Sequence, residues 1–169
     1  MDFESKFYLT NDIYKKYVNK AVCFNIRFIC GILLIISLGL MFISYNSEFY
    51  LFILVCFCFF VLLMIFILYP IIIYNNLIYL KKKIHSDKKY EAIVSFGNDI
   101  RLVEGKQKTT IDYKQISKIY EIDDLVVLMY TIQNGIIVDL NGLLVGDKKS
   151  FYKYILKKCK KVKKIVKRK

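Results

Sequence analysis

The sequence lacks the residue patterns on which most enzymes and nucleotide-binding proteins depend. It contains no P-loop, no dinucleotide-binding fingerprint and no HExxH zinc motif. Its single histidine, His85, lies in the lysine-rich segment KKKIHSDKK, and no serine or cysteine joins it and a carboxylate in a recognisable triad order. These absences predict a protein without catalytic activity and without a cofactor.

Cysteine pairs and clustered metal ligands are also missing. The five cysteines (Cys23, Cys30, Cys56, Cys58 and Cys159) include no CxxC pair, and four of them lie in or beside apolar segments. This pattern argues against a disulfide framework or a zinc site and favours small buried hydrophobic residues.

One short run of acids, Glu121, Asp123 and Asp124, is the remaining candidate for a divalent cation. Acids are ordinary at a turn between strands, and three side chains offer few of the oxygen ligands that such a cation needs. We therefore expect no metal site.

Lysine and arginine are entirely absent between Phe28 and Leu80, although the chain contains 27 of them and has a net charge of +13. The uncharged runs Phe28–Ser44 and Phe49–Tyr74 would extend roughly 25 Å and roughly 39 Å as helices, against a hydrocarbon core of about 30 Å. The sequence therefore predicts two membrane-spanning helices.

Residues at the ends of these runs refine the prediction. The first helix is extended back to Ala21, with Arg27 at the membrane edge, and the overlong second helix is expected to bend near Pro70. A cleaved signal peptide is the alternative for the first run. The long preceding segment and the absence of a small-residue cleavage site after the run argue against it.

The basic residues also predict the orientation. The short connection between the runs has none, whereas five precede Phe28 and 22 lie from Lys81 onward, so the positive-inside rule places both ends in the cytoplasm. Neither run contains GxxxG or an acidic residue, which favours an anchor over a transport pathway.

The remainder is expected to form a small antiparallel sheet closed by a C-terminal helix. Alternating residues predict strands around two turns, at Gly97–Asp99 and at Glu104–Lys106, and Asn134-Gly135 between β-branched runs predicts a hairpin. Helical spacing of apolar residues from Phe151 to Val166 predicts one amphipathic helix to the end of the chain. Near the N-terminus, Phe3–Leu9 alternates as a strand that we expect to join this sheet.

The chain also resembles the YcxB-like family. Phe7, Leu9, Thr10 and Asp12 are similar to the start of that family. Tyr113, Ile116 and Glu121 resemble its central hairpin region, and Phe151 and Leu156 resemble its terminal helix. Where the family often has Pro-Lys, this sequence has Val138, Asp139 and Leu140. The resemblance implies a bacterial protein with a pleckstrin-homology-like (PH-like) domain and no known catalytic activity.

These observations predict an α+β membrane protein with the following segments: a cytoplasmic strand and helix over 1–20, a first span over 21–45, an external loop over 46–48, a second span with its extension over 49–80, and a cytoplasmic domain over 84–169. The expected function is that of a membrane-anchored interaction domain. Its expected partners are the bilayer and a protein, whereas nucleic acid is disfavoured because no aromatic platform accompanies the lysines.

The basic C-terminus is the one candidate binding segment. Attraction to anionic lipid is one explanation for it, and a solvated basic face that follows from cytoplasmic location is the other. The candidate lipid contacts are Lys157, Lys158, Lys160, Lys161, Lys163, Lys164, Lys167, Arg168 and Lys169.

Overall fold

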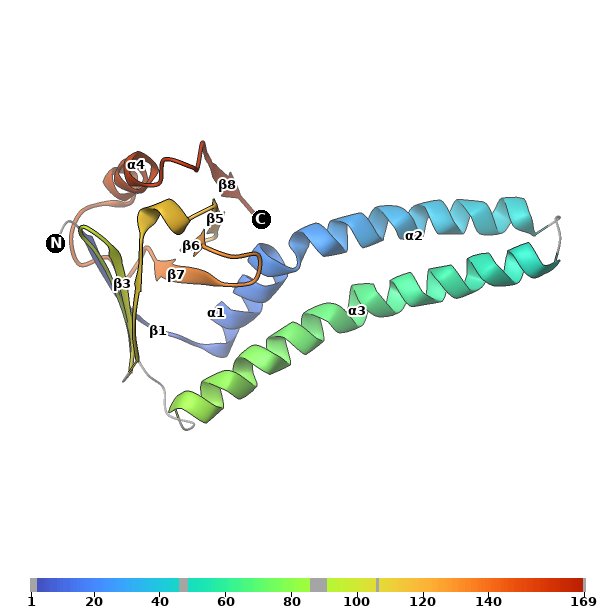
Figure 1. Ribbon diagram of the computed structural model, residues 1–169, viewed down its shortest axis with the longest axis horizontal. Coiled ribbons are helices and arrows are strands. Elements are labelled where there is room, and N and C mark those ends of the chain that lie inside the picture. Colours follow the sequence, from blue (N-terminus) through green and yellow to red (C-terminus); the bar gives the residue numbers. More distant parts are fainter. Residues whose placement is uncertain (1–2, 46–48, 86–90, 106, 169) are drawn as a thin grey trace. The chain divides into compact units, whose positions relative to one another are not determined.

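The computed structural model describes residues 3–45, 49–85, 91–105 and 107–168 (Figure 1). The chain is α+β and divides into two compact units, one formed by Met1–Val22 with Ile78–Lys169 and the other by Cys23–Leu77. The expected external loop at 46–48 and the candidate lipid contact Lys169 lie outside the described residues.

Eight strands and six helical segments are described. The strands are β1 (Phe3–Tyr8), β2 (Glu91–Phe96), β3 (Ile100–Glu104), β4 (Gln107–Ile111), β5 (Lys118–Ile122), β6 (Leu125–Met129), β7 (Gly135–Asp139) and β8 (Ile165–Lys167). The helical segments are α1 (Asn11–Lys16), the π-helical η1 (Tyr17–Val22), α2 (Phe24–Ser44), α3 (Phe49–His85), the 3-10 turn η2 (Tyr113–Gln115) and α4 (Lys148–Lys158).

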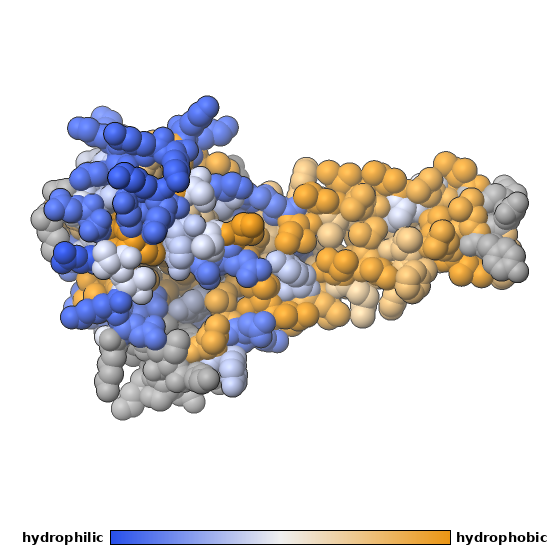
Figure 2. Space-filling model, viewed as in Figure 1, coloured by the Kyte–Doolittle hydropathy of each residue, from blue (hydrophilic) through white to orange (hydrophobic). Residues whose placement is uncertain are grey.

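The unit Cys23–Leu77 consists of α2 and most of α3. Both helices contain a stretch long and apolar enough to cross a membrane, Phe24–Ile43 with 20 residues and Leu51–Leu80 with 30 residues. Figure 2 shows their surface as almost continuously hydrophobic. The second helix continues through Pro70 and ends at His85, beyond the boundary at residue 80 that the sequence suggested.

The other unit contains two four-stranded sheets. In the first, the order is β1-β2-β3-β4 and all neighbours are antiparallel. In the second, the order is β7-β6-β5-β8, and only the β5–β8 pair is parallel. The hairpin predicted at Asn134-Gly135 is confirmed as β6–β7, although its loop comprises residues 130–134 and Gly135 already pairs with Met129.

Helix α4 supplies the centre of the hydrophobic core of this unit. Asp147 begins the helix with a capping box, in which its carboxylate accepts from the backbone of Lys149 and Ser150. Phe151 and Ile155, one turn apart, are fully buried. The Phe151 ring meets the buried ring of Phe96 on β2 edge-to-face, with centroids 5.1 Å apart.

Strand β1 belongs to this unit although it precedes both long helices in the chain. It pairs with β2 over its whole length, from Phe3 opposite Phe96 to Tyr8 opposite Glu91, as the sequence analysis expected. Its other edge contacts the segment after β7: the Lys6 amide donates to the Gly142 carbonyl at 2.9 Å, and the buried Ser5 hydroxyl donates to the Asp139 carbonyl at 2.7 Å. Strand β1 therefore joins the two sheets.

The prediction of one amphipathic helix from Phe151 to Val166 is wrong beyond Lys158. The helix ends with the Cys159 amide bonded to the Ile155 carbonyl, because Cys159 itself adopts a non-helical conformation. Cys159 and Val162 are buried in a turn, and the β-branched pair Ile165-Val166 then extends beside β5. Residues 165–167 therefore pair with the open edge of β5, although the spacing of the apolar residues in this segment also fits a helix.

Gly142 provides a test of the docking of β1. A Cβ atom at this position would collide with the Lys6 carbonyl oxygen, so Gly142→Ala has to push β1 away from the segment after β7. We expect it to lower the free energy of unfolding of the sheet unit by about 1–3 kcal/mol. Thermal unfolding of the full chain in detergent measures the loss, and hydrogen exchange of the β1 amides locates it.

Gly97→Ala is the matched control, because a Cβ atom at Gly97 meets nothing within 4 Å. Equal effects of the two substitutions would contradict the described packing of β1.

Candidate functional site

The lysines of the C-terminal segment do not form one uniform basic face. Among the described residues, five of the predicted lysines are exposed and have no ion pair, hydrogen bond or aromatic contact with another described side chain: Lys157, Lys160, Lys161, Lys163 and Lys164. Helix α4 and the turn after it place them on the solvent side, opposite the buried Phe151, Ile155 and Cys159. These five lysines are the part of the predicted site that remains available to an anionic surface.

Lys158 instead takes part in a contact that holds α4 to the sheet. Its ammonium lies 5.6 Å from the Tyr113 ring centroid and 5.5 Å from that of Tyr154, and it donates to the Gly97 carbonyl at 3.4 Å. The two tyrosine hydroxyls are 2.9 Å apart and each lies 3.2 Å from that carbonyl oxygen, so one hydroxyl donates to the other while the second donates to the carbonyl. Burial, followed by the bond to Tyr154, raises the pKa of Tyr113, so this cluster is uncharged apart from Lys158.

Lys167 and Arg168 also have structural contacts, on the β5 side. The Lys167 ammonium lies 3.6 Å from the half-buried carboxylate of Glu121. Arg168 is buried, with its guanidinium 4.5 Å above the Tyr120 ring, and its amide donates to the Glu121 carbonyl at 2.8 Å. The sequence does not distinguish Lys167 and Arg168 from the neighbouring lysines, because their contacts form only when β8 pairs with β5.

The acidic cluster contacts lysines. Glu121 lies 3.5 Å from Lys148, Asp124 lies 3.8 Å from Lys148, and Asp123 has two lysine partners of its own. Within the described ranges, no group of three potential metal ligands occurs. The chemistry that this cluster supports in the structure is ion pairing within the domain.

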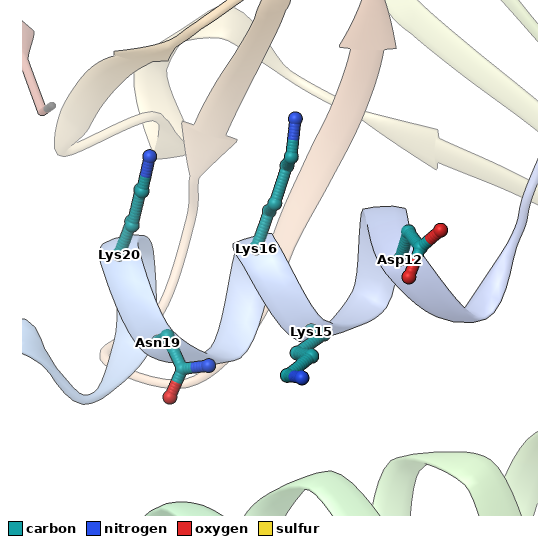
Figure 3. Close-up of a pocket in the computed structure, with 5 residues that line it drawn as sticks. All are labelled: Asp12, Lys15, Lys16, Asn19 and Lys20. Atoms are coloured by element: carbon teal, nitrogen blue, oxygen red, sulfur yellow. The ribbon is translucent and has the colours of Figure 1, made fainter.

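Sequence reasoning missed a second basic site, on the segment that leads into the first long helix. A hollow of about 350 Å³ is lined by Asp12, Lys15, Lys16, Asn19 and Lys20 of α1 and η1. Figure 3 shows Lys16 and Lys20 extending to one side of the helical segment and Lys15 and Asn19 to the other, as residues four apart do on a helix.

Lys16 and Lys20 form ion pairs with a residue of the second sheet's β5–β6 turn. Their ammonium groups lie 2.8 Å and 3.6 Å from the carboxylate of Asp123, at the turn between β5 and β6. The hydrogen bond from Lys16 and the charge of Lys20 lower the pKa of Asp123. Since Asp123 is shared by both lysines and Asp12 also lines the hollow, little net positive charge remains there for a ligand.

Tyr17 fastens the same segment at a second point. Its ring is buried, and its hydroxyl donates to the Gln133 carbonyl in the β6–β7 loop at 2.6 Å. Val18, Ala21 and Val22 are buried beside it. Burial raises the pKa of the Tyr17 hydroxyl, so it remains a donor at neutral pH. The chain that enters the first long helix is therefore docked onto the second sheet at the Asp123 turn and at the loop around Gln133.

The Asp123 ion pairs predict a pH dependence. Because the pKa of Asp123 in the folded protein lies below its unfolded value, near 3.8, these pairs stabilise the fold above about pH 4. The stabilisation is lost as the pH falls through the folded-state pKa. We expect Asp123→Asn to lower the melting temperature at pH 7, and the difference from the natural chain to shrink as the pH falls through the lowered folded-state pKa of Asp123.

Asparagine is the appropriate replacement because Asp123 has a φ of 53°, a conformation that asparagine tolerates. Asp99→Asn, at a turn where the described residues offer no ion pair, is the control. A melting difference for Asp123→Asn that does not shrink as the pH is lowered from 7 through and below the unfolded value of 3.8 would contradict the ion-pair explanation.

Comparison with protein-family models, with curated proteins and with solved structures finds no match to this chain. The resemblance to the YcxB-like family and the PH-like fold therefore remain predictions that rest on the residues quoted above.

Proposed function

We propose that this protein is a membrane-anchored, non-catalytic interaction domain whose sheet unit lies on the cytoplasmic side of the membrane. The observation that carries the proposal is the position of the apolar helices in the chain. Both α2 and α3 are inserted between β1 and β2, two strands that pair side by side in one sheet.

This insertion supports a hairpin anchor. If α2 and α3 each cross the bilayer, the chain leaves the sheet unit at Val22 and returns to it at Ile78, so the first crossing begins and the second crossing ends on the side where β1 meets β2. The excess of lysine on that side supports the cytoplasm as its location.

The surfaces of the two helices support the same conclusion. Their side chains are apolar around the whole circumference, and many large ones are exposed, including Ile35, Phe42 and Phe57. A helix that is hydrophobic on all faces needs an apolar surrounding, and a lipid bilayer provides it. Charged residues occur only near the ends of the two helices. Lys81, Lys82 and Lys83 lie near the end of α3, and Arg27 lies near the start of α2, where its guanidinium is 4.8 Å above the Phe66 ring and can reach the headgroups.

The sheet unit supplies the interaction part of the proposal. Two sheets followed by a helix, β1 to β7 and then α4, agree with the PH-like domain that the YcxB-like resemblance implies. Strand β4 is the edge of its sheet, and Gln107–Thr110 are all exposed there. Such an edge suits the addition of a strand from a protein partner.

Contact with anionic lipid through the exposed lysines of the C-terminal segment is the second candidate. The observation that favours it is that five of the predicted lysines remain exposed while Lys158, Lys167 and Arg168 have contacts within the domain. Exposed lysines near a bilayer are attracted to anionic headgroups by about 1 kcal/mol each.

The anchor has a direct test by thiol labelling in cells. Tyr45→Cys, at the end of α2, should react with an impermeant thiol reagent in intact cells, and Lys157→Cys should react only after permeabilisation. Both replaced side chains are exposed. Labelling of Lys157→Cys in intact cells would reverse the proposed orientation.

The natural chain is the control for that experiment. Cys159 is buried, and burial raises the pKa of its thiol to about 11, so it reacts poorly with the reagent. Cys23 and Cys30 are buried, and Cys56 and Cys58 lie within α3.

The lipid candidate is tested with the full chain in nanodiscs. We expect the amides of residues 159–168 to exchange more slowly in anionic than in neutral lipid at low salt, and replacement of the five exposed lysines by glutamine to remove the difference. Equal exchange in the two lipids at low salt would eliminate this candidate.

A further inference from the structure

The β6–β7 loop, residues 130–134, presents an isoleucine to the outside. Ile132 is 87% exposed, and the loop that carries it is ordered by bonds to Asn134. The Asn134 amide donates to the Thr131 hydroxyl at 2.9 Å, and the Tyr130 amide donates to the Asn134 carbonyl at 3.1 Å. A single exposed isoleucine is ordinary on a protein surface, so its meaning depends on where the loop lies.

The loop lies beside the segment that enters the first long helix. The Tyr17 hydroxyl donates to the carbonyl of Gln133, the residue next to Ile132. In Figure 1 the orange loop after β6 reaches the blue helical segment that follows α1. Tyr17 precedes Cys23 by six residues, which is about 9 Å along a helix.

This distance is comparable to the thickness of the headgroup layer, about 5–7 Å on each side of the hydrocarbon core. If α2 crosses the bilayer from Phe24, the step of six residues from Tyr17 to Cys23 alone keeps the bonded loop within reach of that layer. The adjacent α1–η1 segment also carries the exposed Lys15, whose ammonium suits lipid phosphates.

We infer that the β6–β7 loop is a second membrane contact, in which Ile132 enters the headgroup layer of the bilayer that anchors the chain. The ligand is a lipid surface, met by the aliphatic side chain of an exposed loop, and the segment to which this loop is bonded carries the exposed Lys15. The inference rests on the proposed membrane anchor. Together with the docked α1–η1 segment, this contact gives the sheet unit one preferred orientation on the bilayer.

The natural chain contains no tryptophan, so a single introduced tryptophan reports its own surroundings. In the full chain reconstituted into phosphatidylcholine–phosphatidylglycerol liposomes, Ile132→Trp should lose roughly twofold of its emission when the lipids are brominated near the top of the acyl chains. It should also be shielded from aqueous acrylamide.

Leu144→Trp is the matched control. Leu144 is also an exposed aliphatic residue, at 61%, but its amide is bonded to Glu4 near the start of β1, at the opposite end of the sheet unit from η1. Tryptophan itself favours membrane interfaces, and Leu144→Trp shows how much quenching arises from that preference alone. Equal quenching of the two variants by brominated lipid would overturn the inference.

Leu33→Trp, in the middle of α2, tests the membrane anchor independently of the loop contact. If it is quenched by brominated lipid while Ile132→Trp is not, the anchor stands and the loop contact is refuted. If lipid brominated near the ends of the acyl chains does not quench Leu33→Trp, the anchor itself is refuted, and the loop contact is refuted with it.

Discussion

The pairing of β1 with β2 is the interaction on which the rest of the structure depends. The two strands are 82 residues apart from the end of one to the start of the other, and the entire apolar hairpin lies between them. Strand β1 is also the link between the two sheets, through the bonds of Ser5 and Lys6 to the segment after β7. Without β1, Phe96 would lie at the edge of its sheet, and the core around Phe151 would lose one wall.

The elements predicted well from the sequence are those whose signal is local. Continuous apolar runs between the basic residues mark α2 and α3, and alternation marks β1 and β2, because side-chain burial repeats every second residue in a half-buried strand. Asn134-Gly135 between two β-branched runs marks the β6–β7 hairpin. The end of the chain was predicted poorly for a physical reason. Cys159, Val162 and Val166 fit a helical stripe, but pairing with the free edge of β5 is a contact across the fold that spacing does not reveal.

The candidate site shows the same difference between local sequence signals and contacts across the fold. Sequence alone marked the nine C-terminal cations as one group, since composition treats all of them alike. The fold separates them through Gly97, Tyr120 and Glu121, each of which lies far from its cation in the chain. The Asp123 contact with Lys16 and Lys20 was likewise beyond the reach of sequence patterns, because it joins residues more than 100 positions apart.

The late pairing of β1 also has a consequence for how the protein is made. The ribosome produces β1 before β2, and β2 emerges only after both long helices have been synthesised, so in the proposed anchor β1 is unpaired while the helices insert. If only one helix crossed, the two strands would be left on opposite faces of the membrane and the sheet could not close. For the proposed anchor, pairing of β1 with β2 therefore requires that both helices have crossed, and a chain with only one crossing would expose unpaired strand edges of the kind that chaperones and proteases recognise.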